Sequence, residues 1–199
     1  MCRLFETIQV RDRRLININY HNRRFNQSRL ELFGIKENIC LENIISLPDT
    51  LNDKIYKCRL NYSQTINEIT YSEYIPKIIS TLRIVFCDDI SYNYKYENRI
   101  YLKTLLRQAG TDDILIIKNG FVTDSSFANI IFFDGLKWHT PSTPLLMGTK
   151  RSFLLDTGAV TESEIHYKDI RLFHSSRLIN AMLDPDESSD ILTDQIINF

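Results

Sequence analysis

The first half of the chain consists mostly of short runs of β-branched and aromatic residues with turn residues between them. Runs of this kind predict strands whose neighbours are joined by short turns. We expect the first two strands to form a hairpin. The predicted strands of this half span residues 2–10, 14–18, 54–62, 67–74 and 78–86.

One helix is predicted among these strands. The apolar positions Phe25, Leu30 and Phe33 recur at a spacing that fits a helix over residues 20–33. Gly34 follows them as a stop signal. The pattern therefore predicts a helix that ends just before this glycine.

The second half alternates between helices and strands. Strands are predicted at residues 91–95, 112–120 (ending in an Asn-Gly turn), 127–133, 164–167 and 178–182, and helices at 96–109 and 149–156. Because strands follow one another through short turns, the pattern predicts an α+β fold and disfavours a parallel doubly wound sheet. The pattern of predicted elements is interrupted near residues 88–91. This predicts a small N-terminal domain, residues 1–88, and a larger C-terminal domain, residues 89–199.

Composition narrows the class of protein. With 199 residues, 43% hydrophobic and 25% charged, the chain has the composition of a folded protein. It contains neither a run of 18 apolar residues nor a visible secretory signal, so we expect no membrane partner and a cytoplasmic location. The net charge of −1 gives no general attraction for nucleic acid, although seven arginines lie in the first thirty residues. The cysteines and histidines lack metal-ligand spacing, so no metal site is expected.

Several spaced motifs resemble those of one enzyme family. Residues 121–151 contain V-T-D-S-S-F-A-N, then T-P, then L-M-G-T-K-R, and the opening F-E-T strand is followed by an H-x-x-R helix, residues 21–24. In this order, and over most of the chain, they resemble the fold-type IV pyridoxal-phosphate enzymes, also called class IV aminotransferases. The Ala128-Asn129 pair and a K-x-x-N-R motif are most similar to the aminodeoxychorismate lyases. The resemblance implies a D-amino-acid aminotransferase-like two-domain fold with a shortened N-terminal domain, and a homodimer.

In this family one lysine is linked covalently to the cofactor, pyridoxal 5'-phosphate, and two lysines compete for that role. Lys103 with Thr104 matches a K-T pair, but only ten residues separate it from Asp113, too few for the family's intervening helix. Lys95 leaves eighteen residues, and Lys95-Tyr96-Glu97-Asn98-Arg99 matches K-x-x-N-R. We therefore expect Lys95 to be the catalytic lysine, which also moves the α-proton of the substrate.

The resemblance also implies the residues that bind the cofactor and the substrate. Arg24, the turn Gly148-Thr149-Lys150 and the pair Asn180-Ala181 align with the family's phosphate ligands, with alanine where the family has a hydroxyl. Asp124 aligns with the glutamate that pairs with the pyridine nitrogen, and its side chain is one methylene shorter. Arg59 is the candidate for the substrate carboxylate, because the shortened domain lacks the loops that commonly carry that arginine.

The implied function is elimination of pyruvate from 4-amino-4-deoxychorismate, which gives 4-aminobenzoate for folate biosynthesis. The same cofactor contacts serve aminotransferases of D- or branched-chain amino acids, so a transferase is the alternative. Two further possibilities stay open: a family member that keeps the fold without turnover, and a non-catalytic phosphate or nucleic-acid binding module built on the N-terminal arginines. For the enzyme we expect a small-molecule amino substrate and no nucleic-acid partner.

Overall fold

The computed structural model describes residues 2–197, which divide into two compact units. The first unit runs to Pro76 and also contains Tyr94–Asn98. The second comprises Lys77–Asn93 and the chain from Arg99 onward. The chain therefore passes from one unit to the other three times.

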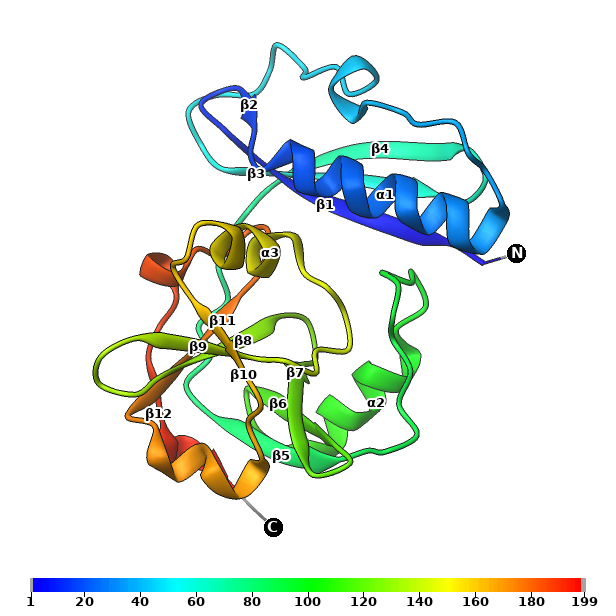
Figure 1. Ribbon diagram of the computed structural model, residues 1–199. Helices are drawn as coiled ribbons and strands as arrows, with labels where there is room; N and C mark the ends of the chain where they lie inside the picture. The colour runs from blue at the N-terminus through cyan, green and yellow to red at the C-terminus, as the bar shows by residue number, and fades with distance from the viewer. Residues whose placement is uncertain (1, 198–199) are drawn as a thin grey trace. The chain divides into compact units, whose positions relative to one another are not determined.

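The division lies before the predicted boundary at residue 88. Strand β5 (Leu82–Phe86) pairs in parallel with β6 (Asp113–Lys118), as Figure 1 also shows. Its hydrogen-bonding partner is thus a strand of the second unit. The sequence prediction assigned residues 78–86 to the first domain, together with the strands that precede them. The strand that pairs with β5 lies about thirty residues later along the chain, so its contribution could not be seen from neighbouring residues.

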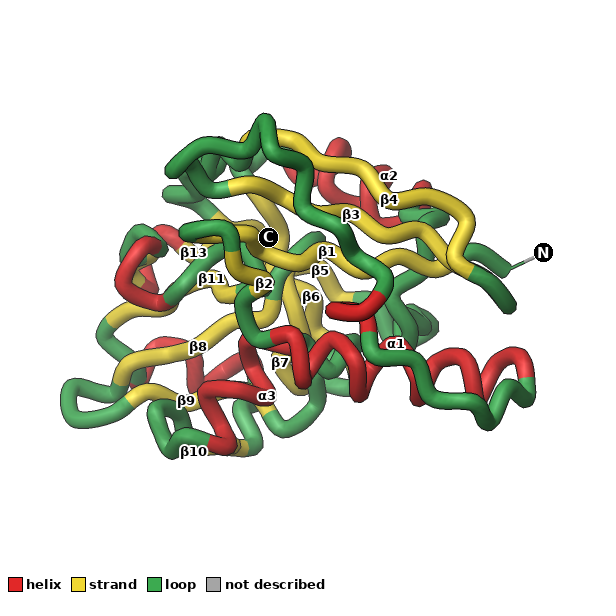
Figure 2. The backbone as a smooth tube through the Cα atoms, turned by 90° about the horizontal axis from the view of Figure 1, so that it is seen from above, coloured by secondary structure: helices red, strands yellow, loops and turns green. Residues whose placement is uncertain are grey.

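The first unit is a four-stranded antiparallel sheet in the order β2-β1-β3-β4. Its strands are β1 Leu4–Arg11, β2 Arg14–Leu15, β3 Tyr56–Tyr62 and β4 Ile66–Glu73. Helix α1, Ile18–Phe33, runs alongside this sheet in Figures 1 and 2. It buries Phe25 among the apolar side chains of β1 and β3. Gly34, at φ 70°, ends the helix in the left-handed conformation that glycine adopts without strain, and a short 3-10 turn follows at Leu41–Asn43.

The second unit contains two sheets, in the orders β13-β5-β6-β7 and β10-β9-β8-β11-β12. The remaining strands are β7 Phe121–Ser125, β8 Asn129–Phe133, β9 Trp138–Pro141, β10 Thr161–Ser163, β11 Ser175–Ile179, β12 Ile191–Leu192 and β13 Ile196–Ile197. Its helices are α2 Ile100–Ala109 and α3 Thr149–Asp156, with 3-10 turns at Tyr167–Leu172, Pro185–Glu187 and Thr193–Gln195. The predicted α+β class is confirmed.

One apolar cluster joins the two sheets of the second unit. Leu115 and Ile117 of β6, Val122 of β7, Ile130 of β8 and Leu178 of β11 belong to it, and each is almost completely buried. Burying such side chains supplies most of the favourable free energy of a fold. This core fixes β7 against β8, the two strands that carry the site described below.

The stretch at 91–95 was predicted as a strand and the helix was predicted to begin at residue 96, and both predictions are wrong. Helix α2 begins at Ile100, and the preceding residues follow an irregular path. Phe5 N donates to Lys95 O at 3.0 Å, and Glu97 N donates to Arg3 O at 2.9 Å. The segment is therefore held by the start of β1, and Tyr94 and Tyr96 pack in the apolar cluster of the first unit.

The two predicted strands nearest the C-terminus are displaced. Residues 164–167, predicted as a strand, contain an isolated bridge at His166, and β10 lies just before them at Thr161–Ser163; the strand predicted at 178–182 corresponds to β11 at Ser175–Ile179. β11 begins three residues earlier than predicted, because its pairing partner β8 sets the register. The predicted helix at 149–156 coincides with α3.

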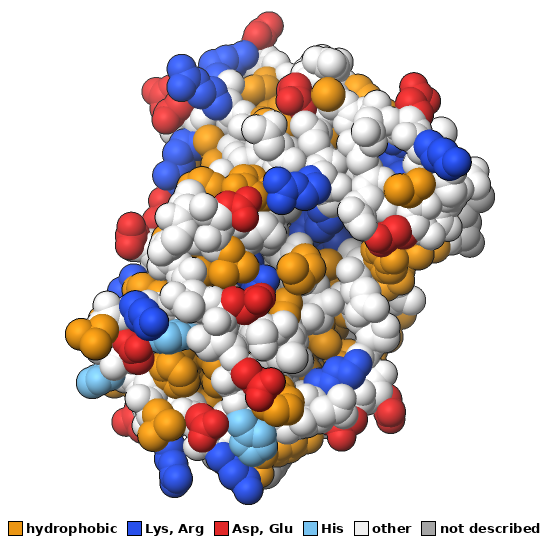
Figure 3. All heavy atoms as spheres, viewed as in Figure 1, with side chains coloured by type: hydrophobic (Ala, Val, Ile, Leu, Met, Phe, Trp, Pro, Cys, Tyr) orange, Lys and Arg blue, Asp and Glu red, His pale blue; other side chains and the backbone are white. Residues whose placement is uncertain are grey.

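The arginines near the N-terminus do not all face solvent. Arg29 is buried: its Nη1 donates to Glu37 O at 2.9 Å, and its guanidinium lies over the ring of Phe25. Arg24 is also largely enclosed, with its side chain 13% exposed. Figure 3 shows basic and acidic side chains scattered over the drawn face. Within residues 2–197, no helix combines the length and the apolar character that crossing a bilayer requires.

Candidate active site

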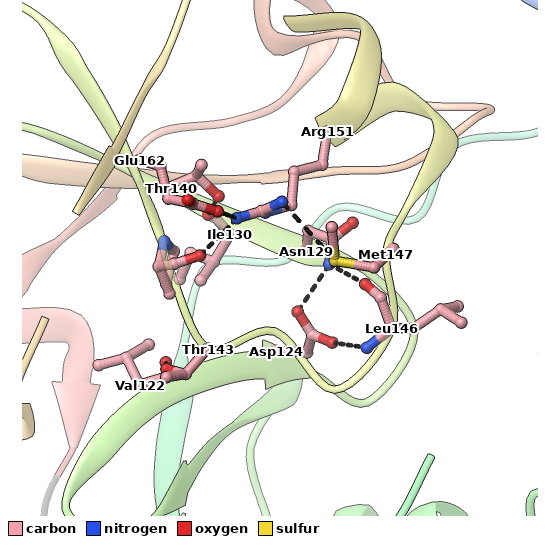
Figure 4. A network of polar contacts seen from close by, with 11 residues as sticks. Val122, Asp124, Asn129, Ile130, Thr140, Thr143, Leu146, Met147, Arg151 and Glu162 are labelled. Carbon is pink, nitrogen blue, oxygen red and sulfur yellow. Dashed lines mark hydrogen bonds and ion pairs between the residues drawn. The ribbon is translucent and has the colours of Figure 1, made fainter. Parts of the chain in front are cut away.

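Asp124 lies near the end of β7, in the interior of the second unit. Its side chain accepts a hydrogen bond from Asn129 Nδ2 at 2.7 Å and another from Leu146 N at 3.0 Å, one on each carboxylate oxygen (Figure 4). Burial raises the pKa of this carboxyl to about 6, although both hydrogen bonds and the charge of Arg151 act in the opposite direction. An ionised carboxylate in such surroundings favours a cationic partner.

Helix α3 begins just after Leu146, the residue whose backbone amide binds Asp124. Gly148 is its N-cap, and the next two residues, Thr149 and Lys150, are buried. A Cβ built on Gly148 would lie 1.8 Å from Asn129 Oδ1, so only glycine fits here without displacement. The first amides of a helix point outward and carry partial positive charge, and they attract anions such as phosphate.

The pair Asn180-Ala181 forms a tight turn directly after β11. Asn180 and Leu183 exchange backbone hydrogen bonds, and Asn180 Oδ1 accepts from Met182 N at 2.8 Å. The buried ammonium of Lys150 binds the carboxylate of Asp184, next to this turn. The structure thus brings the start of α3 and the segment after β11 together, and their predicted binding of phosphate stays a prediction.

Three of the predicted residues, Arg24, Arg59 and Lys95, lie in the first unit. Glu6 of β1 is completely buried and binds two side chains of α1: Arg24, through Nε at 2.9 Å and Nη2 at 2.5 Å, and His21, through Nδ1 at 2.7 Å. Burial by itself raises the pKa of Glu6, but the charge of Arg24 and the hydrogen bonds from both partners lower it to about 2. Burial lowers the pKa of His21, although the hydrogen bond to Glu6 acts in the opposite direction.

Lys95 and Arg59 both lie over the ring of Phe5. The Arg59 guanidinium is 4.0 Å from the ring centroid, and Lys95 Nζ is 4.9 Å from it. Such cation–π contacts fix the position of a charged group while leaving its polar atoms able to bind others. Arg59 Nε also donates to Asn61 Oδ1 at 3.0 Å. The competing lysine, Lys103, is exposed on α2.

Comparison with known proteins identifies the family. Residues 92–184 match the model of the amino-transferase class IV family. An uncharacterized protein of Haemophilus influenzae is 43% identical over 183 residues, which are 90% of this chain and 97% of that protein. A crystal structure from Haemophilus somnus, named "putative 4-amino-4-deoxychorismate lyase", is 36% identical with a TM-score of 0.86, over 92% of this chain and 97% of that one. The chain belongs to the class IV aminotransferase family.

This result confirms the family that the motifs predicted. Because it is a family of enzymes, the protein is an enzyme. A structure from Mesorhizobium loti, named "putative amino-acid aminotransferase", is 19% identical, covers 100% of both chains and has a TM-score of 0.78. At that identity the likeness shows a shared fold. The two structures therefore share one fold over the whole of this chain.

Three residues of this class IV family member make buried polar contacts that the sequence analysis did not predict. Glu6 belongs to the F-E-T motif and Asn129 to the Ala-Asn pair, but both were used only as marks of resemblance. Arg151, the last residue of L-x-G-x-x-R, is completely buried and donates to Pro141 O at 2.8 Å and Glu162 Oε1 at 2.5 Å (Figure 4). Their presence within motifs was a usable signal, since a polar or charged residue that becomes buried requires a partner.

Proposed function

We propose that this protein is a pyridoxal-phosphate lyase that releases pyruvate from 4-amino-4-deoxychorismate and yields 4-aminobenzoate. The observation that carries the proposal is the buried Asp124 carboxylate beside the glycine turn that begins α3. The 36% identity to the protein from Haemophilus somnus, whose name states this activity, supports the choice of substrate. Within the protein, we assign the covalent attachment of the cofactor to Lys95.

The residues of the second unit fit the two ends of pyridoxal phosphate. A carboxylate with two oxygens has about four acceptor positions, so Asp124 can accept from a pyridine N–H in addition to its two existing partners. The phosphate is a dianion, which suits the amides after Gly148 and the hydroxyl of Thr149. When bound, the cofactor supplies an electron sink for the bond broken at the substrate's α-carbon.

Each protein group then has a defined task. Asp124 holds the proton on the pyridine nitrogen, which preserves the electron demand of the ring. Arg24, Gly148–Lys150 and the amides of Asn180-Ala181 retain the phosphate. The amine of Lys95 accepts and returns the proton at the α-carbon.

The substrate carboxylate is assigned to Arg59. Its guanidinium and the Lys95 amine share the Phe5 ring, so an acid group bound by the one lies within reach of the other. Guanidinium groups bind carboxylates through two parallel hydrogen bonds, which orients the substrate. The Arg59 side chain is 34% exposed and is 3.7 Å from Glu97, a contact weak enough to be exchanged for a substrate.

An aminotransferase acting on D- or branched-chain amino acids is the second candidate. It would use every cofactor contact named above, and the family model carries the aminotransferase name. The lyase assignment also includes a homodimeric enzyme, a cytoplasmic location and a role in folate biosynthesis. These three properties belong to the proposal.

The test is a reduction and mapping experiment on the full-length protein. Purified protein incubated with pyridoxal phosphate is treated with borohydride, digested, and analysed by mass spectrometry. We expect the label on Lys95, and no label in Lys95→Ala. Lys103→Ala is the matched control and should be labelled like the wild type.

Two assays then separate the candidate reactions. Pyruvate release from 4-amino-4-deoxychorismate without a keto acid supports the lyase, whereas amino transfer that requires a keto acid supports the transferase. A label on Lys103 would refute the lysine assignment. Labelling without either activity would indicate a family member that has lost turnover, and absence of any label would leave a binding module.

A further inference from the structure

Asn129, the first residue of β8, connects two parts of the second unit that the proposed function assigns to the cofactor. The residue is 6% exposed. Its Nδ2 donates to Asp124 Oδ1 at 2.7 Å and to Leu146 O at 2.9 Å, and Leu146 N donates to Asp124 Oδ2 at 3.0 Å (Figure 4). The three residues form a closed ring of hydrogen bonds. Each bond in the ring restricts the orientation of the carboxylate.

The other atom of the same amide group lies against the glycine turn. Asn129 Oδ1 occupies the position that a side chain on Gly148 would need, with 1.8 Å between Oδ1 and a Cβ built there. Gly148 is the N-cap of α3. One asparagine side chain is therefore in contact with both the carboxylate and the start of the helix.

The turn between β7 and β8 does not depend on Asn129. Ser125 Oγ accepts from the amide of Ala128 at 3.0 Å and from that of Phe127 at 3.3 Å, and Ser125 N donates to Ala128 O at 2.9 Å. These bonds close the turn by themselves. The amide of Asn129 is directed instead toward Asp124 and the loop before α3.

We propose that Asn129 is the positioning residue that sets the pyridine-nitrogen contact and the phosphate contact of the cofactor relative to each other. This inference rests on the proposed function. A short aspartate side chain makes the placement more demanding, because its carboxylate reaches less far than that of a glutamate. Asn129 acts through Asp124 and Gly148 and takes no part in the bond changes.

The experiment measures cofactor binding by the full-length protein. For wild type, Asn129→Ala and Asn26→Ala, we would determine the Kd for pyridoxal phosphate, the visible circular dichroism of the bound cofactor and the Tm without cofactor. Asn26 is the matched control, since its amide likewise bonds to backbone: Nδ2 to Ile39 O and Oδ1 to Ile39 N, both at 2.9 Å. It lies on α1 of the first unit.

We expect Asn129→Ala to weaken binding about 10- to 100-fold, as expected for loss of a hydrogen bond to a charged group, and to alter the dichroism. Asn26→Ala should lower the Tm and leave the Kd within about two-fold of wild type. In an Asp124→Ala background the same Asn129→Ala change should weaken binding by a clearly smaller factor. A merely structural residue would give equal factors in both backgrounds.

A second variant keeps the inference testable if Asn129→Ala does not fold. Gly148→Ala forces the Asn129 amide from its place, so it should weaken binding in the same direction. Wild-type affinity and dichroism in Asn129→Ala or in Gly148→Ala would overturn the inference, as would equal factors in the two backgrounds. Failure of the proposed function is distinct, because the wild-type protein itself would then bind no cofactor and show no label on Lys95.

Discussion

The carboxylate of Glu6 accepts two hydrogen bonds from one edge of the Arg24 guanidinium, from Nε to Oε1 at 2.9 Å and from Nη2 to Oε2 at 2.5 Å. This bidentate arrangement joins β1 to α1 in a fixed orientation. His21 Nδ1 binds the same carboxylate at 2.7 Å. A single acidic residue therefore determines where the arginine proposed to bind phosphate points.

Glu6→Gln should reduce stability at neutral pH and change its dependence on acid. The pKa of Glu6 is about 2 in the folded protein and 4.5 as its ordinary value, so its contribution is complete above about pH 4.5 and is lost as the pH falls toward 2. The difference corresponds to about 3 kcal/mol. Urea unfolding between pH 3 and 7 should show a flatter profile for the variant. An identical profile in wild type and variant would contradict the prediction, and Glu6→Asp should keep most of the acid dependence.

Arg24→Ala should release the cofactor more readily. Loss of a charge-assisted contact to phosphate corresponds to a Kd increase of about 10- to 100-fold. Arg24→Lys keeps the charge without the planar fork and should give an intermediate value. Because Arg24→Ala also leaves the buried Glu6 without its main partner, the measurement is repeated in a Glu6→Gln background. Arg23→Ala, at the exposed neighbouring position, should bind like wild type.

The wild-type protein should become less stable as the pH rises from acid to neutral, and Asp124→Asn should not show this decrease. The folded-state pKa of Asp124, about 6, lies above its ordinary value of 3.8, so the folded protein keeps this proton to higher pH than the unfolded chain. Stability therefore falls as the pH rises from about 4 to 6, by about 3 kcal/mol from this group. Unfolding of cofactor-free protein across this range checks the prediction. The same pH-dependent fall in both proteins would refute it.

Arg151→Met should lower the free energy of unfolding by about 2–4 kcal/mol, a Tm decrease of roughly 5–15 °C. The side chain is completely buried, and its removal deprives Pro141 O of its donor. Glu162→Gln is the contrasting variant, since the Glu162 side chain is 49% exposed and its replacement should cost less than about 1 kcal/mol. Thermal unfolding of both variants measures the difference, and equal losses would show that the exposed partner matters as much as the buried one.

Local patterns were sufficient for elements whose sequence signals come from neighbouring residues. Helix α3 follows a glycine and coincides with its predicted range, and the Asn119-Gly120 turn joins β6 to β7 as predicted. Asp124 was located by its place in a motif. The choice of Lys95 over Lys103 was made from the spacing to Asp113, and it stays a prediction.

Features that depend on distant partners escaped prediction. The aromatic residues around Tyr94 and Tyr96 look like a strand, yet they pack on the first unit, and only the paired backbone of β1 reveals this. The Lys150–Asp184 pair joins residues thirty-four positions apart. From the sequence alone, Glu6 could equally be an exposed residue of a strand. Its two partners, His21 and Arg24, lie on helix α1, and only the packing of this helix brings them to Glu6.

The return of Tyr94–Asn98 to the first unit has a practical consequence for dissecting the protein. No single cut separates the two units: a fragment ending at Pro76 would lack Tyr96, which bridges to Leu4, and Lys95, whose carbonyl accepts from Phe5. Proteolytic nicking after Pro76 should therefore yield two pieces that stay associated, with Lys95 on the C-terminal piece.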